Sequence, residues 1–306
     1  MSRTIGFVGL GVMGQAMAKN LALKMPNEGG KALYVYDVDT KKAQNLADVS
    51  AASEGAKIIV SSLVEIGRQA DIIFLSLPSS SIVREVVLGA GGLAEFLKEG
   101  SIIVDTSTTE VETVKTIARE LEKRSIAFAD TPVSGGEKGA IDGTLSFMAG
   151  GSPAAFETIK PYIEAMASSV VYMGEVGAGQ TAKAVNQMIV GAAFAVIAES
   201  FSMGVKNGLD PKVLYNAIKG GWAGSKVLDV AAKDIADRQF TPGGTVNLLY
   251  KDLGYAMSLS RDTDSPVPLT SLVYEMFKAS RAHGDGGKSQ TVLVRLWEDL
   301  LNIEVK

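Results

Sequence analysis

Lys183 is the side chain in this sequence best suited to move a proton. It follows the glycines Gly177 and Gly179 and stands near the start of a long segment with helical periodicity. Asn186 and Gln187 come three and four residues later, so all three side chains share one face of the expected helix. A lysine buried against apolar neighbours can have its pKa lowered until it exchanges a proton near neutral pH. The spacing favours a general acid or base, and a helix-start lysine without catalytic role is the alternative.

A glycine-rich turn near the N-terminus has the spacing that binds a dinucleotide. Gly9, Gly11 and Gly14 form the pattern Gly-x-Gly-x-x-Gly directly after an apolar run over residues 4–8. The first glycine permits a tight turn, the second lets the backbone approach a pyrophosphate, and the third lets the next helix pack on the sheet. The pyrophosphate then lies at a helix N-terminus, where the dipole favours an anion. The predicted cofactor-binding turn comprises Gly9, Leu10, Gly11, Val12, Met13 and Gly14.

Asp37 stands where a dinucleotide-binding fold needs an acid. It ends the second apolar run (residues 32–36) and lies 23 residues after the last glycine of the turn. Such an acid accepts hydrogen bonds from the ribose hydroxyls. Its charge repels the 2′-phosphate of NADP, so we predict NAD as the cofactor, with NADP left open because Lys41 and Lys42 follow closely. The alternative is that Asp37 only begins a turn with Asp39.

Ser134 lies beside Gly135 and Gly136 after another apolar run. Glycines next to a serine at a strand end expose backbone amides and a hydroxyl, and such a group can hold a carboxylate. A plain turn is the alternative, and the residues alone leave both interpretations open.

Other spacings carry less weight. The single histidine, His283, lies in a glycine-rich segment, which is a poor place for a buried base. Residues 282–289 fit a loose phosphate-binding pattern, but that loop must follow a strand, and a helical run precedes it here. The spacing Tyr-x-x-x-Lys occurs twice in the second half, which shows how little it means, as Tyr215 with Lys219 and Tyr274 with Lys278.

The elements that position these residues alternate up to about residue 175. Apolar runs buried on both faces, alternating with helices, predict an α/β fold with a Rossmann-like, doubly wound, mostly parallel sheet. One helix start is predicted in detail, with Thr109 as the N-cap and Glu112 completing a capping box. The expected strands are 4–8, 32–36, 71–75, 101–105, 127–130, 145–149 and 170–173, with helices at 12–23, 81–87, 110–123 and 154–166.

The second half shows long amphipathic stretches and no convincing strand. We therefore expect a dinucleotide-binding domain over residues 1–175 and an all-helical substrate and dimerisation domain over residues 176–306. The most apolar stretch, 188–198, is shorter than a bilayer span, which needs about 20 residues, so we expect a buried helix. The expected helices are 180–207, 211–219, 227–237, 248–263, 271–282 and 291–301.

Composition excludes several classes of protein. The 306 residues fit two domains, and 46% hydrophobic with 21% charged residues is typical of a globular chain. A net charge of −4 argues against a nucleic-acid partner. The absence of cysteine removes disulfides, thiolate nucleophiles and thiolate metal ligands, and we expect no metal site. No secretory leader or membrane span is expected, which favours a cytoplasmic protein.

Four ordered motifs resemble the β-hydroxyacid dehydrogenase family, and the resemblance covers essentially the whole chain. The family includes 3-hydroxyisobutyrate dehydrogenase, tartronate semialdehyde reductase and L-threonate dehydrogenase. Any one motif would be a weak signal, but four at the family's spacing are a strong one. The motifs are residues 9–21, residues 130–136, the pattern Gly177-x-Gly179-x-x-x-Lys183 and residues 251–254.

The resemblance implies a Rossmann domain joined through a long helix to an all-α domain, usually in a homodimer or homotetramer. It implies reversible hydride transfer between a nicotinamide and the β-carbon of a small hydroxy acid. By similarity, Lys183 is the general acid in reduction and the base in oxidation, while Ser134 and the amides of Gly135 and Gly136 hold the substrate carboxylate. The other residues it implies at the cofactor are Leu77, Pro78, Ser107, Thr108, Lys251 and Asp252.

Two departures from the family bear on the substrate. The family often has asparagine four residues after the catalytic lysine, where this chain has Gln187 preceded by Asn186, so which amide meets the substrate stays open. Many members carry a phenylalanine eight residues before the aspartate of the Lys-Asp pair, where this chain has Gly244. Loss of that ring would enlarge the pocket. The first departure resembles tartronate semialdehyde reductases and the second threonate dehydrogenases.

We therefore expect an NAD(P)-dependent oxidoreductase acting on a three- or four-carbon β-hydroxy acid or semialdehyde. Examples are tartronate semialdehyde reduction and L-threonate oxidation. A 3-hydroxyisobutyrate dehydrogenase is one alternative. A non-catalytic dinucleotide-binding protein is another, although such a protein would be expected to lose Lys183 first. Similar imine reductases replace this lysine with aspartate or tyrosine, so Lys183 argues against imine reduction.

Overall fold

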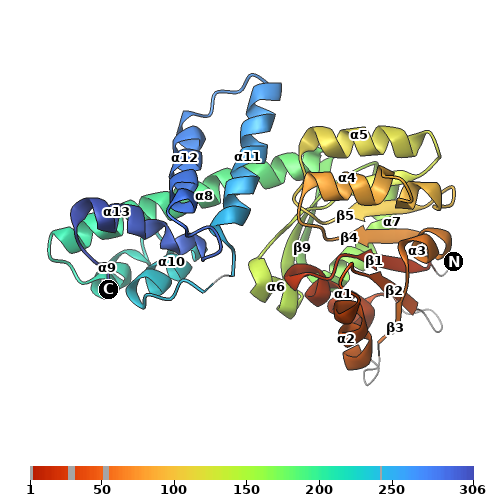
Figure 1. The fold of residues 1–306 in the computed structure, drawn as a ribbon, viewed down its shortest axis with the longest axis horizontal. Helices are drawn as coiled ribbons and strands as arrows, with labels where there is room; N and C mark the ends of the chain where they lie inside the picture. The colour runs from red at the N-terminus through yellow and green to blue at the C-terminus, as the bar shows by residue number, and fades with distance from the viewer. Residues whose placement is uncertain (1–2, 27–31, 51–54, 242) are drawn as a thin grey trace. The chain divides into compact units, whose positions relative to one another are not determined.

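The computed structural model describes residues 3–26, 32–50, 55–241 and 243–306 (Figure 1). The chain divides into two compact units, Met1–Lys183 and Ala184–Lys306. The division falls inside the long helix α8 (Ala178–Lys206), directly after Lys183. The first unit holds all the strands of the sheet, and in the described residues of the second unit only helices and one isolated bridge occur.

The sheet of the first unit confirms the predicted mostly parallel fold. Its strands are β1 (Ile5–Val8), β2 (Ala32–Tyr36), β3 (Lys57–Val60), β4 (Ile72–Leu75), β5 (Ile102–Asp105), β6 (Ala127–Asp130), β7 (Val133–Ser134), β8 (Leu145–Gly150) and β9 (Ala167–Gly174). Strands β3-β2-β1-β4-β5-β6 are parallel to their neighbours and follow the order of dinucleotide-binding folds. Strand β8 then runs antiparallel to β6, and β9 pairs with β8 in parallel. The carboxyl ends of the parallel strands therefore share one edge.

Helices cover both faces of this sheet, because its strands are apolar on both sides. They are α1 (Val12–Lys24), α2 (Thr40–Ser50), α3 (Leu63–Gln69), α4 (Ser80–Leu88), α5 (Val111–Glu122), α6 (Gly136–Asp142) and α7 (Pro153–Ile163). Phe7 and Phe74 pack in one core with α1 and α2, whereas Ile73 and Leu75 pack in a second core with α4 and α5. Figure 1 shows these two helix pairs on opposite sides of the sheet. This arrangement is the predicted double winding.

The predicted capping box at the start of α5 is wrong. The Thr109 hydroxyl donates to the buried carboxylate of Asp105 at 2.7 Å, and Glu112 stays exposed on the helix surface. A hydroxyl inside the protein gains more from a charged acceptor than from an exposed backbone amide. The structure places a capping box at α3 instead, where Ser62 and Glu65 exchange side-chain and backbone hydrogen bonds. Strands β3 and β7 are not among the strands predicted from the sequence.

The second unit packs its helices around one apolar core. They are the second part of α8, α9 (Pro211–Ile218), α10 (Lys226–Ala236), α11 (Val246–Asp262), α12 (Pro268–Ala282) and α13 (Arg295–Leu301). Side chains of the core come from distant parts of the unit, including Phe194, Phe201, Leu253, Phe277 and Val292. The expected helices are present, except that residues 290–294 form a 3-10 turn before α13.

Helix α8 agrees in extent with the helix expected over residues 180–207, but it is less evenly buried than predicted. It has 29 residues, and by length and composition alone it could cross a membrane. The apolar stretch 188–198 lies inside this helix, as the expected helix over residues 180–207 implies. Phe194 and Phe201 lie in the core, while Ile189, Val196 and Met203 are exposed. One such helix is weak evidence for a span, since core helices pass the same test.

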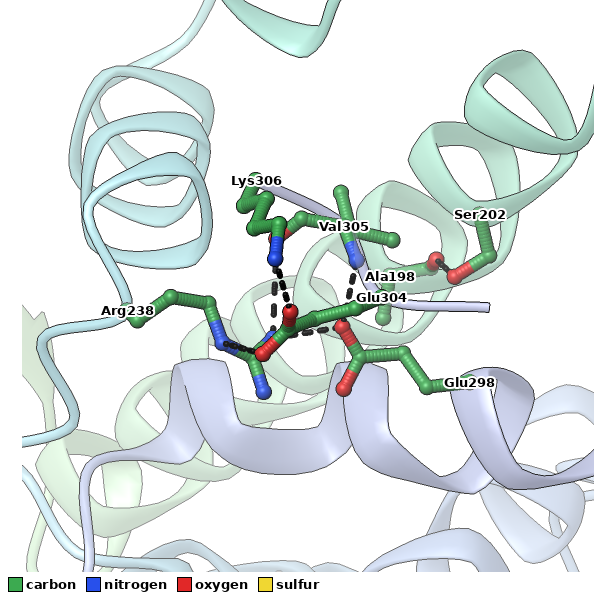
Figure 2. A network of polar contacts seen from close by, with 7 residues as sticks. All are labelled: Ala198, Ser202, Arg238, Glu298, Glu304, Val305 and Lys306. Carbon is green, nitrogen blue, oxygen red and sulfur yellow. Dashed lines mark hydrogen bonds and ion pairs between the residues drawn. The ribbon is translucent and has the colours of Figure 1, made fainter. Parts of the chain in front are cut away.

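A polar network holds the last residues of the chain against the helices of the second unit. Figure 2 shows the Arg238 guanidinium between the carboxylates of Glu298 and Glu304. Glu298 is buried and also accepts a hydrogen bond from the Val305 amide at 2.7 Å. The Val305 side chain is fully buried in the apolar core. Glu298 is thus the shared acceptor that keeps the end of the chain in place.

Replacing Glu298 with alanine is expected to lower the free energy of unfolding by about 2–4 kcal/mol. The change leaves the buried Val305 amide without its acceptor and removes one of the two carboxylates that pair with the half-buried Arg238 guanidinium. Breaking a fully buried pair costs about 3–5 kcal/mol, and the remaining Glu304 reduces the loss here. Urea denaturation followed by circular dichroism measures the loss. Glu304→Ala is the matched control, because that carboxylate is exposed and contributes little. Equal losses in the two variants would contradict the anchoring role of Glu298.

Candidate active site

The glycine turn after β1 has its first and third glycines where no side chain fits. Gly9 has a φ of +93°, and a Cβ there would lie 2.3 Å from the Ser76 carbonyl oxygen. A Cβ on Gly14 would lie 2.0 Å from the Gly9 carbonyl oxygen. Gly11 differs, because a Cβ there would meet nothing within 4 Å, and this residue is the N-cap of α1. The open space at a helix N-terminus fits the pyrophosphate of a dinucleotide.

Asp37 joins the ends of β1 and β2. Its carboxylate accepts hydrogen bonds from the Leu10 amide at 2.6 Å and from the Asp39 amide at 2.8 Å. The Lys42 ammonium lies 3.9 Å from the same carboxylate. The turn with Asp39 is therefore present, and the bond to Leu10 places the acid directly beside the glycine turn. That is the position from which it could accept hydrogen bonds from a ribose.

Two further predicted cofactor segments meet at the same edge of the sheet. Leu77 follows β4 and Ser107 follows β5, and the Leu77 amide donates to the Ser107 hydroxyl at 2.8 Å. The Ser107 amide in turn donates to the carboxylate of Asp105 at 3.0 Å, within β5. Pro78 and Thr108 are the next residues in each segment. The structure thus brings both segments together beside the carboxyl end of β1.

Lys183 lies against the glycine loop expected to hold a carboxylate. Its side chain is 7% exposed, and its Nζ donates to the Val133 carbonyl oxygen at 2.8 Å. Ser134 comes next in the chain, followed by Gly135 and Gly136 with φ angles of +134° and +64°. Such angles favour glycine and turn the backbone sharply into α6. A buried amine and a serine-glycine loop are thereby neighbours in the first unit.

Asp130 fixes the start of α8, a role that the sequence analysis missed. Its fully buried carboxylate accepts hydrogen bonds from the amides of Gly177 at 2.7 Å and Gln180 at 2.8 Å. Burial raises the pKa of Asp130 to about 6, the two backbone hydrogen bonds oppose this rise, and the Asp105 carboxylate adds to it. Asp105 and Asp130 are direct partners in β5 and β6. Acids ending adjacent apolar runs were a visible signal of a shared site.

A separate polar cluster occupies the second unit. The Gln187 amide donates to the buried Asp252 carboxylate at 2.6 Å and accepts from the Asn186 amide at 2.8 Å. The Lys251 ammonium lies 2.9 Å from the other oxygen of Asp252. Gln187 is therefore held by protein on both sides of its amide, whereas Asn186 is only half-buried.

Gly244 lies against a polar side chain. A Cβ at this position would lie 2.9 Å from the side-chain nitrogen of Gln290. The backbone amide of Gln290 donates to the Gly244 carbonyl oxygen at 3.0 Å. The position at which many family members are expected to carry a phenylalanine ring therefore lies next to the side-chain amide of Gln290.

The single histidine, the loose phosphate-binding pattern and one Tyr-x-x-x-Lys pair each make contacts within the second unit. His283 is about half exposed, with its Nδ1 3.6 Å from Asp299. Lys288 pairs with Asp285 in a turn that follows helix α12 rather than a strand. The Tyr274 hydroxyl donates to a tyrosine on α11, and burial with this hydrogen bond raises the pKa of Tyr274 to about 12.

Comparisons with known proteins agree with this geometry. Residues 4–174 match the model of the NAD-binding domain of 6-phosphogluconate dehydrogenase. Residues 177–297 match the model described as NAD-binding of NADP-dependent 3-hydroxyisobutyrate dehydrogenase. Together the two models span most of both units, with the change from one to the other just before α8.

Individual relatives match over nearly their full length. The chain is 34% identical to 2-(hydroxymethyl)glutarate dehydrogenase of Eubacterium barkeri over 98% of this chain and 97% of the relative. It is 34% identical to 2-hydroxy-3-oxopropionate reductase of Escherichia coli (strain K12) over 97% and 98%. The solved structure of Mycobacterium tuberculosis 3-hydroxyisobutyrate dehydrogenase with L-serine is 28% identical, covers 97% and 99%, and superposes with a TM-score of 0.83.

The dinucleotide turn, the buried lysine and these full-length matches lead to one conclusion. The chain belongs to the β-hydroxyacid dehydrogenase family and is an NAD(P)-dependent oxidoreductase.

Proposed function

We propose that this enzyme transfers a hydride between a nicotinamide and the β-carbon of a three- or four-carbon β-hydroxy acid. The observation that carries the proposal is the buried Lys183, whose Nζ donates a hydrogen bond to the Val133 carbonyl oxygen. Val133 directly precedes the loop of Ser134, Gly135 and Gly136. A proton-exchanging amine and a carboxylate-binding loop are the two groups that a small hydroxy acid requires.

Each group has one role in the proposed reaction. Ser134 and the amides of Gly135 and Gly136 hold the substrate carboxylate, which fixes the β-carbon relative to Lys183. In oxidation the Lys183 amine takes the proton of the β-hydroxyl while the hydrogen on the β-carbon leaves as hydride, so that a carbonyl forms. In reduction the ammonium returns that proton to the carbonyl oxygen. The bound nicotinamide supplies the hydride acceptor or donor.

The cofactor-side residues belong to the same proposal. The turn from Gly9 to Gly14 would hold the pyrophosphate, and the open space beside Gly11 supports this placement. Asp37 would accept hydrogen bonds from the ribose. The roles of the remaining residues follow from the family resemblance, and these residues are Leu77, Pro78, Ser107, Thr108, Lys251 and Asp252.

The substrate we propose carries at least one hydroxyl group in addition to the group that reacts, as tartronate semialdehyde and L-threonate do. Gly244 provides no ring, and the amide of Gln290 lies against it. An amide can bond a hydroxyl of the substrate, while a ring favours an apolar substituent such as the methyl group of 3-hydroxyisobutyrate. Asn186 is the amide we assign to the substrate, because Gln187 is engaged by Asp252. A 3-hydroxyisobutyrate dehydrogenase is the second candidate, supported by the family models.

Cofactor reduction by the purified enzyme tests this proposal. Glycerate, L-threonate, 3-hydroxyisobutyrate and serine are compared with NAD and with NADP, and the absorbance of the reduced nicotinamide is followed. The highest kcat/KM is expected with glycerate or L-threonate. A preference for 3-hydroxyisobutyrate would favour the second candidate. Dinucleotide binding without turnover of any acid would favour a protein that binds the cofactor without catalysis.

The charge of Asp37 is expected to make NAD the preferred cofactor. Asp37→Asn keeps an oxygen for the Leu10 amide but removes the negative charge that repels a 2′-phosphate. The kcat/KM ratio of NAD to NADP is expected to fall about tenfold or more, since unfavourable like-charge contacts cost over 1 kcal/mol. Asp39→Asn is the matched control for the same charge change two residues on. An unchanged ratio in Asp37→Asn would remove this residue from cofactor selection.

We also propose a homodimer or homotetramer in the cytoplasm. Ile189, Val196 and Met203 are exposed at seven-residue spacings on α8, a pattern that a second helix can cover. Sedimentation of the wild type would show a multiple of the 32.1 kDa chain mass. A sequence without cysteine is compatible with a reducing compartment.

A further inference from the structure

A buried amide links the loop after β5 to the helix that carries Lys183. Gln180 is 2% exposed, and its Oε1 accepts a hydrogen bond from the Thr109 amide at 3.0 Å. Its Nε2 donates to the Ser107 carbonyl oxygen at 2.8 Å. The partners define the orientation of the amide, because an N–H faces the oxygen and a carbonyl faces the NH2 group. Gln180 therefore spans Thr108 and holds this loop at both ends.

The backbone of Gln180 is fixed from the other side. Its amide donates to one oxygen of Asp130 at 2.8 Å, and the other oxygen accepts from Gly177 at 2.7 Å. The first amides of a helix have no partner within the helix, so this carboxylate from β6 secures the first turn of α8. Lys183 comes three residues after Gln180, and the two side chains lie on one face, a turn apart. The loop and the lysine thus share one rigid connection.

We infer that Gln180 is a positioning residue that sets the separation between the bound nicotinamide and the Lys183 ammonium group. The inference rests on the proposed function, in which Ser107 and Thr108 line the nicotinamide and Lys183 moves the proton. Gln180 acts through its two backbone partners and supplies no reacting atom. Only a side chain with a donor and an acceptor at this spacing satisfies both partners. A displacement of about 1 Å between reacting groups can cost about 100-fold in rate.

The first test replaces Gln180 with methionine, which is similar in length and makes neither hydrogen bond. We expect kcat to fall about 10- to 100-fold, with the KM for the acid changed less than about threefold. The dinucleotide Kd, measured by calorimetry, should rise severalfold because the loop is less well held. Gln44→Met is the matched control, since the Gln44 amide is exposed and donates to Asp48 on its own helix. That control should match the wild type in kcat, Kd and Tm.

The second test uses Gln180→Glu and remains informative if the methionine variant folds poorly. A protonated carboxyl group offers a carbonyl oxygen to Thr109 and a hydroxyl to Ser107, which reproduces both hydrogen bonds. The ionised form sets two oxygens against the loop and repels the Ser107 carbonyl. Burial raises the pKa of a carboxyl group, so protonation falls within a workable range. We expect the kcat of this variant, relative to wild type, to rise as the pH is lowered, while Gln180→Met stays low throughout.

Two results would overturn the inference. One is a wild-type kcat in Gln180→Met while Lys183→Ala is inactive. The other is a kcat of Gln180→Glu that keeps the same ratio to the wild-type kcat at every pH. Full turnover in Lys183→Ala would instead overturn the proposed role of the lysine, and this inference with it. The lysine variant therefore separates failure of the proposed function from failure of the positioning role.

Discussion

Replacing Lys183 with alanine is expected to lower kcat by about 100- to 10,000-fold, the usual contribution of a positioned acid or base. The Nζ of this lysine donates a hydrogen bond to the Val133 carbonyl oxygen, next to the loop proposed to hold the substrate carboxylate. The substitution leaves the glycine turn and Asp37 untouched, so the dinucleotide Kd should change less than about threefold. Steady-state kinetics with the best acid of the panel, together with calorimetry for the dinucleotide, measure both quantities.

Two companion variants make this result specific. Lys183→Arg keeps a positive charge but cannot exchange a proton near neutral pH, and it should be nearly as slow as the alanine variant. Lys206→Ala removes an exposed lysine at the other end of the same helix and should leave kcat unchanged. Substantial turnover in Lys183→Arg would show that the charge matters, and that the lysine does not move the proton.

Replacing Gly11 with valine is expected to weaken dinucleotide binding about 5- to 150-fold without unfolding the protein. No atom lies within 4 Å of a Cβ at this position, and the backbone there is extended, so the fold tolerates a side chain. The added carbons would fill the space proposed for the pyrophosphate. Forcing extra methyl groups into an occupied site costs about 1–3 kcal/mol, which corresponds to the stated range of Kd. Calorimetric titration with NAD measures the change.

Gly220→Val and Gly14→Ala complete this experiment. A Cβ on Gly220 also meets nothing within 4 Å, but it lies in the helical unit, and its replacement should leave the Kd unchanged. A Cβ on Gly14 would lie 2.0 Å from the Gly9 carbonyl oxygen, so Gly14→Ala should lower the Tm as well as the affinity. Wild-type affinity in Gly11→Val would move the dinucleotide away from the glycine turn.

The strands that could be predicted are those whose burial leaves a continuous apolar run. Strand β5 is buried along its whole length, and its residues are apolar up to Asp105. Strand β3 lies at the edge of the sheet, where it pairs with β2, and it begins with the exposed Lys57, so its apolar run is only three residues long. Strand β7 has two residues and exists through its pairing with β8. Pairing between distant segments leaves no local pattern.

The same limit applies to the site. The glycine turn and Lys183 can be recognised because each belongs to a short, ordered motif. The bond between Asp130 and Gly177 spans 47 residues, and that between Thr109 and Gln180 spans 71, so no local spacing indicates either. The wrong cap at Thr109 has a different origin, because Asp105 lies only four residues before it and outside the segment that the capping-box pattern covers. A rule that considers four residues cannot weigh the buried carboxylate of Asp105, which takes the hydroxyl.

The placement of α8 across the two units has a consequence for the order in which the chain acquires its structure during synthesis. The partners of its first turn, Asp130 and the loop at Ser107, leave the ribosome before the helix does. Starting a helix is the unfavourable step, and these earlier partners stabilise that first turn at once. The partners of its second half, such as Leu253 and Phe277, are made much later. The nascent chain therefore holds a growing helix whose apolar face has nothing to pack against until synthesis is nearly complete, a period in which exposed apolar surface favours aggregation.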